Sequence, residues 1–178
     1  MIAPILKGRK TTLKPMEPKH AEIRFKWYSN PKVAKYQNFG FSSKGKLREN
    51  IIKRRKSDKS LPWIILAEDK KLIGEVQLRE INRKDKRATI AINIGETEFW
   101  NKGYATDAIQ VVNKYFFTKL KYNRVELNVE SENIAGINCY TKCGFKKEAI
   151  LRQAIYKNKK YRDLILMSLI KDDYQKIK

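Results

Sequence analysis

The sequence predicts a mixed α/β domain of the α+β class, in which helices come first and a sheet follows. Three observations support this class: helical spacing in the first third, three strands in the middle, and a strand–helix–strand–helix–strand succession at the end. The 178 residues are 42% hydrophobic and 11% aromatic, the composition of a chain that folds around a core. Because no repeat or change of composition marks a boundary, we expect one domain over residues 1–178.

The first third of the chain is expected to carry one strand and three helical segments. The predicted elements are a strand at Thr11–Pro15, a helix from Pro18 to about Ser29, a turn from Pro31 to the break at Gly40, and a helix at Lys44–Lys59. Ser42 or Ser43 is the expected cap of the last helix. That helix has a narrow apolar stripe and is otherwise rich in Lys and Arg. We interpret its basic side as a solvated face, with a phosphate-facing edge as the alternative.

Strands dominate from Trp63 onward. Trp63–Ala67 is a continuous apolar run, typical of a strand covered on both faces, while Leu72–Ile81 and Arg87–Ile94 show strand alternation. The short loops between these three segments predict an antiparallel meander. The remaining expected elements are an amphipathic helix ending near Leu120, a strand at Arg124–Val129, a short helix at Asn133–Lys142, and a hairpin of Phe145–Tyr156 with Tyr161–Ile170.

The stretch Phe99–Leu120 places a glycine-bearing loop directly before the amphipathic helix. A strand, such a loop and a helix aim unpaired first-turn N–H groups and the positive end of the helix dipole at one point, which favours a phosphate. Gly103 lacks the companion glycines of a dinucleotide-binding fingerprint, and no Gly-Lys-Ser/Thr follows it as in a Walker loop. The sequence therefore predicts an anion site of another kind.

The charge balance is unusual, because 40 Lys and Arg face 19 Asp and Glu, for a formal net charge of +21. An acidic partner and a Lys-rich composition without binding meaning are both open explanations. Cys139 and Cys143 are expected to be buried small residues in a reducing compartment, and with His20 as the sole histidine no metal site is expected. No apolar run is long enough for a signal peptide or a membrane span, so we expect a cytoplasmic protein.

Four segments in this order resemble the GNAT-type N-acetyltransferases, in the branch of the ribosomal-protein N-terminal and spermidine acetyltransferases. They are FKWYSNPKVAKY, FWNKGYATDAI, ENIAGINCYTKCGF and KYRDLILMSLIKDDY, and the resemblance covers nearly the whole chain. It implies a GNAT-like fold with a central twisted, mostly antiparallel sheet of about seven strands, splayed in the middle and flanked by about four helices. It also implies acetyl-CoA as co-substrate. We expect no metal, no membrane binding, and a monomer or homodimer.

The same resemblance implies a set of cofactor-contacting residues. The backbone of Asn101–Ala105 would cradle the pyrophosphate, and the strand end at Ile92–Ile94 would pair with the pantetheine arm as an added strand. Trp100 stands where the family's general pattern has Gln or Arg, a variation that this branch shares, and Asn101 replaces a common glycine. The full set is Ile92, Asn93, Ile94, Trp100, Asn101, Lys102, Gly103, Tyr104, Ala105, Thr106, Asn128, Asn133, Asn138 and Tyr140.

Transfer of acetyl from a thioester to an amine needs a neutral amine, an oxyanion stabiliser and a proton for the leaving thiolate. Tyr140 matches the family's general-acid tyrosine, and a phenol with an ordinary pKa of about 10 can donate that proton. A core tyrosine packed against the sheet is the alternative interpretation. A carboxylate, often acting through water, is expected as the base. The candidates are Glu75 in mid-strand and Glu96 or Glu98 at a strand end.

The motifs leave the acceptor open. A polycation such as spermidine would be repelled by the net charge unless an acidic pocket overcame it, so three acceptors remain: a protein N-terminus, an amino sugar and a small amine. Nucleic acid is expected only as part of a ribosome- or nucleotide-linked acceptor. Two other functions are open: a basic nucleic-acid-binding module that uses the Lys44–Lys59 helix, and a GNAT-fold protein that binds acetyl-CoA without catalysis. Aromatic residues in apolar-periodic positions argue against the first.

Overall fold

The computed structural model describes residues 2–37 and 43–177, so the predicted break at Gly40 and the alternative cap Ser42 lie outside the described residues. Its helices are α1 (Ala21–Ser29), α2 (Pro31–Ala34), α3 (Lys44–Lys56), α4 (Tyr104–Thr118), α5 (Ile134–Lys142) and α6 (Lys171–Lys176). Its strands are β1 (Leu6–Lys7), β2 (Thr12–Pro15), β3 (Leu61–Leu66), β4 (Leu72–Asn82), β5 (Arg87–Ile94), β6 (Arg124–Glu130), β7 (Lys146–Lys157) and β8 (Lys160–Ile170). None of the helices in the described ranges is long and apolar enough to cross a membrane.

Eight strands form one mixed sheet in the order β1-β2-β3-β4-β5-β6-β8-β7. Neighbouring strands are antiparallel except β5 and β6, which run parallel. The GNAT-like fold is confirmed, with eight strands where about seven were predicted and six described α-helices where about four were predicted. Two of the added elements are short, since β1 spans two residues and α6 spans six, too few for a periodic pattern to reveal them.

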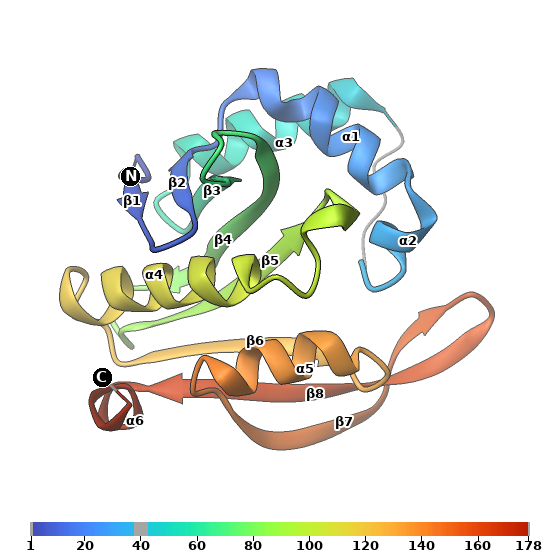
Figure 1. Ribbon diagram of the computed structural model, residues 1–178. Coiled ribbons are helices and arrows are strands. Elements are labelled where there is room, and N and C mark those ends of the chain that lie inside the picture. The colour runs from blue at the N-terminus through green and yellow to red at the C-terminus, as the bar shows by residue number, and fades with distance from the viewer. Residues whose placement is uncertain (1, 38–42, 178) are drawn as a thin grey trace.

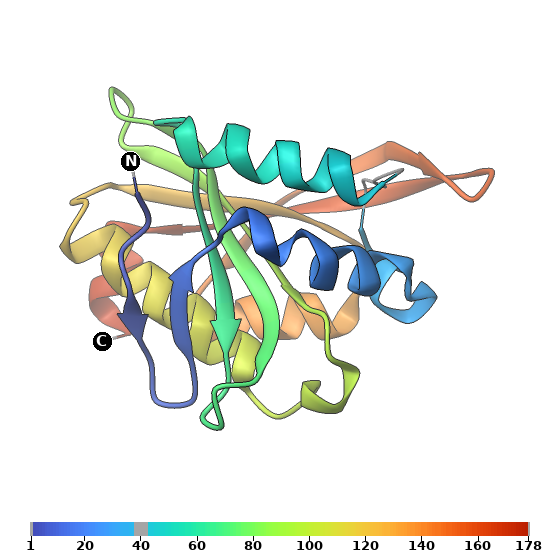
Figure 2. The ribbon, with the colours of Figure 1, turned by 90° about the horizontal axis from the view of Figure 1, so that it is seen from above.

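Helices cover both faces of the sheet, as Figures 1 and 2 show. α4 and α5 pack on one face around the larger core, to which Ile109 and Phe116 of α4 belong. α1 and α3 pack on the other face around a smaller core that includes Leu47 and Ile51. Trp63 of β3 lies in the larger core and its neighbour Ile64 in the smaller one, which confirms a strand covered on both faces.

The basic helix α3 is largely the solvated surface that its sequence predicted. Ser43 is its N-cap, accepting a hydrogen bond from the Lys46 N–H at 3.2 Å, and the helix ends at Lys56, three residues before the predicted boundary at Lys59. Its lysines are exposed. Two arginines turn inward instead: Arg54 donates to the Gln77 side chain and Arg55 to the Met16 carbonyl, both at 2.7 Å.

Candidate active site

The parallel strands β5 and β6 diverge in the middle of the sheet (Figure 1), and we call the gap between their unpaired backbone edges the slot. The two strands pair at three positions, from Arg87–Arg124 to Thr89–Glu126. Beyond them β5 stays paired only with β4, as far as Ile94, and β6 only with β8, as far as Glu130. Within the described residues no strand covers these two facing edges, so their backbone groups can bond an extended ligand. The predicted splay is present.

The glycine loop lies at the mouth of this slot. Because β5 and β6 run parallel, the loop into α4 and the loop into α5 both leave the same edge of the sheet. Asn101 and Gly103 have φ angles of 58° and 84°, the left-handed region that Asn tolerates and Gly favours. The first bond of α4 runs from the Asp107 N–H to the Gly103 carbonyl at 3.0 Å. The N–H groups of the preceding helical residues therefore lie outside the helical ladder, as an anion cradle requires.

Two contacts join this loop to its surroundings. The Trp100 indole N–H donates to the Ile94 carbonyl at 2.8 Å, which ties the loop to the end of β5. On the open side, no heavy atom of the described residues, those next to Gly103 in the chain apart, lies within 4 Å of the position that a Cβ on Gly103 would occupy. Lys102 is exposed beside it, and Lys10 Nζ donates to the Lys102 carbonyl at 3.1 Å. An anion at this loop therefore has backbone donors beneath it and lysines nearby.

Asp107 is a residue that the sequence analysis missed. Its buried carboxylate accepts hydrogen bonds from the Arg9 N–H at 2.9 Å, the Thr11 N–H at 2.9 Å and the Thr11 hydroxyl at 2.6 Å. The Lys10 N–H adds a fourth at 3.2 Å. Asp107 thus fastens the turn between β1 and β2 to the first turn of α4. Acidic residues are common in the first turn of a helix, where they interact favourably with the helix dipole. The local sequence around Asp107 therefore did not indicate that it binds a distant turn.

The predicted asparagines lie on both sides of the slot. Asn93 is on β5, and Asn128 is an exposed residue on β6. The Asn133 side chain accepts a hydrogen bond from the Gly136 N–H at 3.0 Å and so caps α5, while Asn138 is exposed on that helix. The Nδ2 atom of Asn93 is buried without a hydrogen-bond partner among the described residues. It is therefore a buried donor whose hydrogen bond is not satisfied by the described residues.

Tyr140 lies on α5 and is 9% exposed. Its ring packs edge-on against Phe145, with centroids 5.8 Å apart. The Tyr140 hydroxyl forms no hydrogen bond with a described residue. Its oxygen is nevertheless not fully enclosed by the protein. Burial, followed by the neighbouring Cys139 and Cys143, raises the pKa of Tyr140 above its ordinary value. The phenol therefore keeps its proton throughout the neutral range.

The three candidate bases have different environments. Glu75 is 4% exposed and forms an ion pair with Arg24, and it also accepts hydrogen bonds from Tyr28 and Gln77. Burial, followed by the Glu75 charge, raises the pKa of Tyr28, which keeps that hydroxyl a donor. Glu98 is exposed and bonds Lys71 at 2.6 Å, which lowers the pKa of Glu98.

Glu96 is half-buried beside the end of β5. Its carboxylate accepts one hydrogen bond from the Trp27 indole N–H at 2.8 Å. Trp27 itself is held tightly, because its ring lies 2.1 Å from where a Cβ on Gly95 would stand. Glu96 therefore has a fixed position and, unlike Glu75 and Glu98, no described cation bonded to it.

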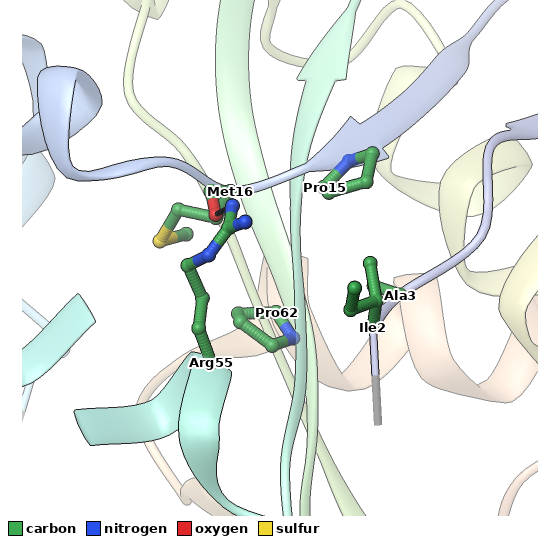
Figure 3. Close-up of a pocket in the computed structure, with 6 residues that line it drawn as sticks. All are labelled: Ile2, Ala3, Pro15, Met16, Arg55 and Pro62. Atoms are coloured by element: carbon green, nitrogen blue, oxygen red, sulfur yellow. Dashed lines mark hydrogen bonds between the residues drawn. The ribbon is translucent and has the colours of Figure 1, made fainter. Parts of the chain in front are cut away.

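A small hollow near the N-terminus does not compete as a site. A hollow lined by Ile2, Ala3, Pro15, Met16, Arg55 and Pro62 has a volume of about 10 Å³, enough for one water (Figure 3). The Arg55 guanidinium points across it to the Met16 carbonyl. Among the described residues, no group of three or more His, Cys, Asp or Glu is arranged to hold a metal ion.

Comparison with known proteins agrees with this geometry. The family model described as an acetyltransferase (GNAT) domain matches residues 10–146. The uncharacterized N-acetyltransferase p20 of Bacillus licheniformis is 34% identical over 172 residues, covering 92% of this chain and 94% of its own length. The spermidine N(1)-acetyltransferase of Vibrio cholerae is 29% identical over 148 residues, covering 83% and 80%.

The solved structures agree as well. A spermidine N-acetyltransferase of Vibrio cholerae in complex with CoA and spermine superposes with a TM-score of 0.86 at 27% identity, over 93% of this chain and 98% of that one. The described chain therefore shares its overall fold with a relative that was solved with CoA bound. The chain therefore belongs to the GNAT acetyltransferase family and is an acetyl-CoA-dependent N-acetyltransferase.

Proposed function

We propose that the chain moves the acetyl group of acetyl-CoA directly to a primary amine, with both substrates bound together. The main observation behind this proposal is the slot between β5 and β6. The loop before α4 and helix α5, which carries Tyr140, both follow these strands. A ligand in the slot meets backbone donors at one end and a buried phenol at the other. Two substrates that approach from opposite faces of the sheet can then meet within it.

The proposed cofactor contacts follow the slot. The N–H groups of Asn101–Ala105 bind the pyrophosphate, assisted by the start of α4 at Thr106. Ile92–Ile94 bond the pantetheine arm through their backbone, while Asn128, Asn133 and Asn138 contact the cofactor from β6 and α5. Trp100 closes the loop against Ile94. The open side of Gly103 and the unpaired edges of both strands support this arrangement.

In the proposed chemistry Tyr140 is the general acid. The amine nitrogen attacks the carbonyl carbon, the carbon–sulfur bond breaks, and its electron pair goes to sulfur. The phenol gives its proton to that sulfur as the thiolate leaves. The Tyr140 hydroxyl supports this role because it bonds to no described residue and carries its proton at neutral pH.

We propose Glu96, acting through water, as the base that removes a proton from the amine, with Glu75 as the competing candidate. The charge of Glu75 balances that of Arg24, so protonating Glu75 would remove the negative charge that faces a buried guanidinium. Glu96 has no described cation bonded to it, because its hydrogen bond comes from the neutral indole of Trp27. Taking up a proton at Glu96 therefore disrupts no ion pair. It also lies at the end of β5, beside the loop that we assign to the cofactor.

The test compares Glu96→Gln with Glu75→Gln. Glu96→Gln should lower kcat by about 10²–10⁴ and remove the acid limb of the pH dependence of kcat/KM, with little change in stability. Glu75→Gln should instead lower the free energy of unfolding by about 3–5 kcal/mol, because Arg24 loses its buried partner. The opposite pattern, with the rate loss in Glu75→Gln, would assign the base to Glu75.

For the acceptor, we propose a primary amine of low positive charge: a protein N-terminus, an amino sugar or a small amine. The net charge of +21 repels a polyamine at long range and attracts the phosphates of acetyl-CoA. The relative that binds spermine makes polyamines the main competing class. A reducing cytoplasm is the compartment that we propose, which the free Cys139 and Cys143 support.

The deciding experiment measures thiol release from acetyl-CoA with N-terminal peptides, amino sugars, small amines and polyamines, each at low and high salt. We expect turnover with an acceptor of low charge. Turnover with spermidine or spermine alone would replace our acceptor class by polyamines. Cofactor binding without turnover on any amine would favour a non-catalytic role, and binding of an oligonucleotide in place of acetyl-CoA would favour the nucleic-acid module.

A further inference from the structure

Two cysteines that the proposed chemistry does not use converge on the first turn of α4. Cys139 and Cys143 stand one turn apart on α5, and both face Thr106. The Cys139 Sγ lies 3.4 Å from the Thr106 hydroxyl, and the Cys143 Sγ lies 3.6 Å from the Thr106 carbonyl. Cys139 is half-buried, whereas Cys143 is only 2% exposed. Cys139 is therefore the more exposed residue of the pair.

The surroundings of Cys139 favour its thiolate. The Cys139 sulfur lies against the Thr106 hydroxyl, and the Cys143 S–H donates to the Thr106 carbonyl. The neighbouring Cys143 thiol, followed by the Thr106 hydroxyl and the Lys142 charge, lowers the pKa of Cys139 to about 7, whereas Cys139 and burial raise the pKa of Cys143. Cys139 is thus the more nucleophilic thiol of the pair.

We propose that Cys139 is a modification site for the disulfide of a small thiol, and that an adduct there blocks acetyl-CoA. The Cys139 thiolate attacks one sulfur of the disulfide, a bond forms between the two sulfurs, and the other half leaves as a thiolate. No further oxidant is needed. A disulfide between Cys139 and Cys143 is disfavoured instead, because side chains one turn apart on a helix do not reach the required geometry.

The adduct would act through Thr106. A group attached to the Cys139 sulfur takes the space now shared with the Thr106 hydroxyl at 3.4 Å, so α5 and the first turn of α4 must separate. That turn carries N–H groups of the cofactor loop, so this consequence rests on the proposed function. Removing the adduct with a reductant restores the contact.

The test uses the aromatic disulfide dithiobis(nitrobenzoate) on the full chain, followed by intact mass and peptide mapping. We expect one fast equivalent on Cys139 and none in Cys139→Ser or Cys139→Ala. Cys143→Ala should still react, but about three- to fourfold more slowly at pH 7. Losing the neighbouring thiol lowers the thiolate fraction, and the higher nucleophilicity of a more basic thiolate offsets part of that loss.

Binding supplies the second measurement. The Cys139 adduct should bind acetyl-CoA at least tenfold more weakly by calorimetry, dithiothreitol should restore the affinity, and Cys139→Ser should bind like the wild type before and after treatment. Equal labelling of both cysteines, reaction no faster than free cysteine, or an adduct with unchanged affinity would each overturn the proposal. If the untreated chain fails to bind acetyl-CoA, the proposed cofactor site fails, while the selectivity for Cys139 is still measured.

Discussion

Replacing Gly103 with alanine should weaken acetyl-CoA binding while the fold survives. Gly103 has a φ of 84°, and an alanine in this left-handed region costs about 1–2 kcal/mol. The added methyl group meets no steric clash, because no described residue other than the chain neighbours of Gly103 has an atom within 4 Å of the new Cβ. For a chain of this length, strain of that size lowers Tm by roughly 2–8 °C.

The loss of affinity has a separate origin. We assign the open side of Gly103 to the pyrophosphate, so a methyl group there holds the phosphate away from the N–H groups of the loop. Losing one hydrogen bond to a charged group costs about 1.5–3 kcal/mol. The Kd for acetyl-CoA should therefore rise roughly tenfold to a hundredfold.

Calorimetry with acetyl-CoA and thermal unfolding separate these two effects, with Gly45→Ala as the matched control. Gly45 lies within α3, and the nearest atom to its added Cβ is the Ser43 Oγ at 3.7 Å. Alanine there should stabilise the chain by about 0.5–1 kcal/mol and leave Kd unchanged. A Gly103→Ala variant that unfolds a few degrees earlier but binds like the wild type would show that the pyrophosphate does not rest on this loop.

Three further predictions concern single side chains. Tyr140→Phe should lower kcat by about 10²–10⁴ while the calorimetric affinity for acetyl-CoA holds, and equal thiol release would remove Tyr140 as the acid. Asp107→Ala leaves the Thr11 N–H and its neighbours without their acceptor, so urea titration should show a loss of about 3 kcal/mol. Arg124, followed by Ser168, lowers the pKa of Glu148 to about 2, so its stabilisation is present at neutral pH and lost as pH falls from about 5 toward 2. Glu148→Gln should flatten that part of the stability curve, and an unchanged slope would contradict it.

Local sequence patterns were sufficient to predict the elements in which buried residues recur at regular spacing. The predicted spacing of α4 reappears as Ala108, Val112 and Phe116, all fully buried, and the two-sided burial of β3 follows from its unbroken apolar run. The hairpin predicted around Lys157–Lys160 is likewise present, because Asn158 and Lys159 both adopt positive φ as a two-residue turn requires.

Pairings between distant residues could not be predicted in this way. The partner of Glu75 is Arg24, which stands 51 positions earlier, and Asp107 receives hydrogen bonds from residues almost a hundred positions away. Each carboxylate has an unremarkable local sequence, so nothing near it indicates a buried cation or an approaching turn. For the same reason Glu75 and Glu96 were equivalent as candidate bases, although their environments in the structure differ sharply.

The slot between β5 and β6 is stable because each half of the sheet has its own support. β5 pairs with β4 at seven positions and β6 with β8 at seven, against three between the two halves. The facing edges are left with backbone groups that need a partner, since an unpaired group costs about 1–3 kcal/mol once water is excluded. An extended ligand with amide groups of its own, such as a pantetheine arm, meets that need on entering. The gap in the sheet is therefore the place where we propose that such a ligand adds its own backbone hydrogen bonds.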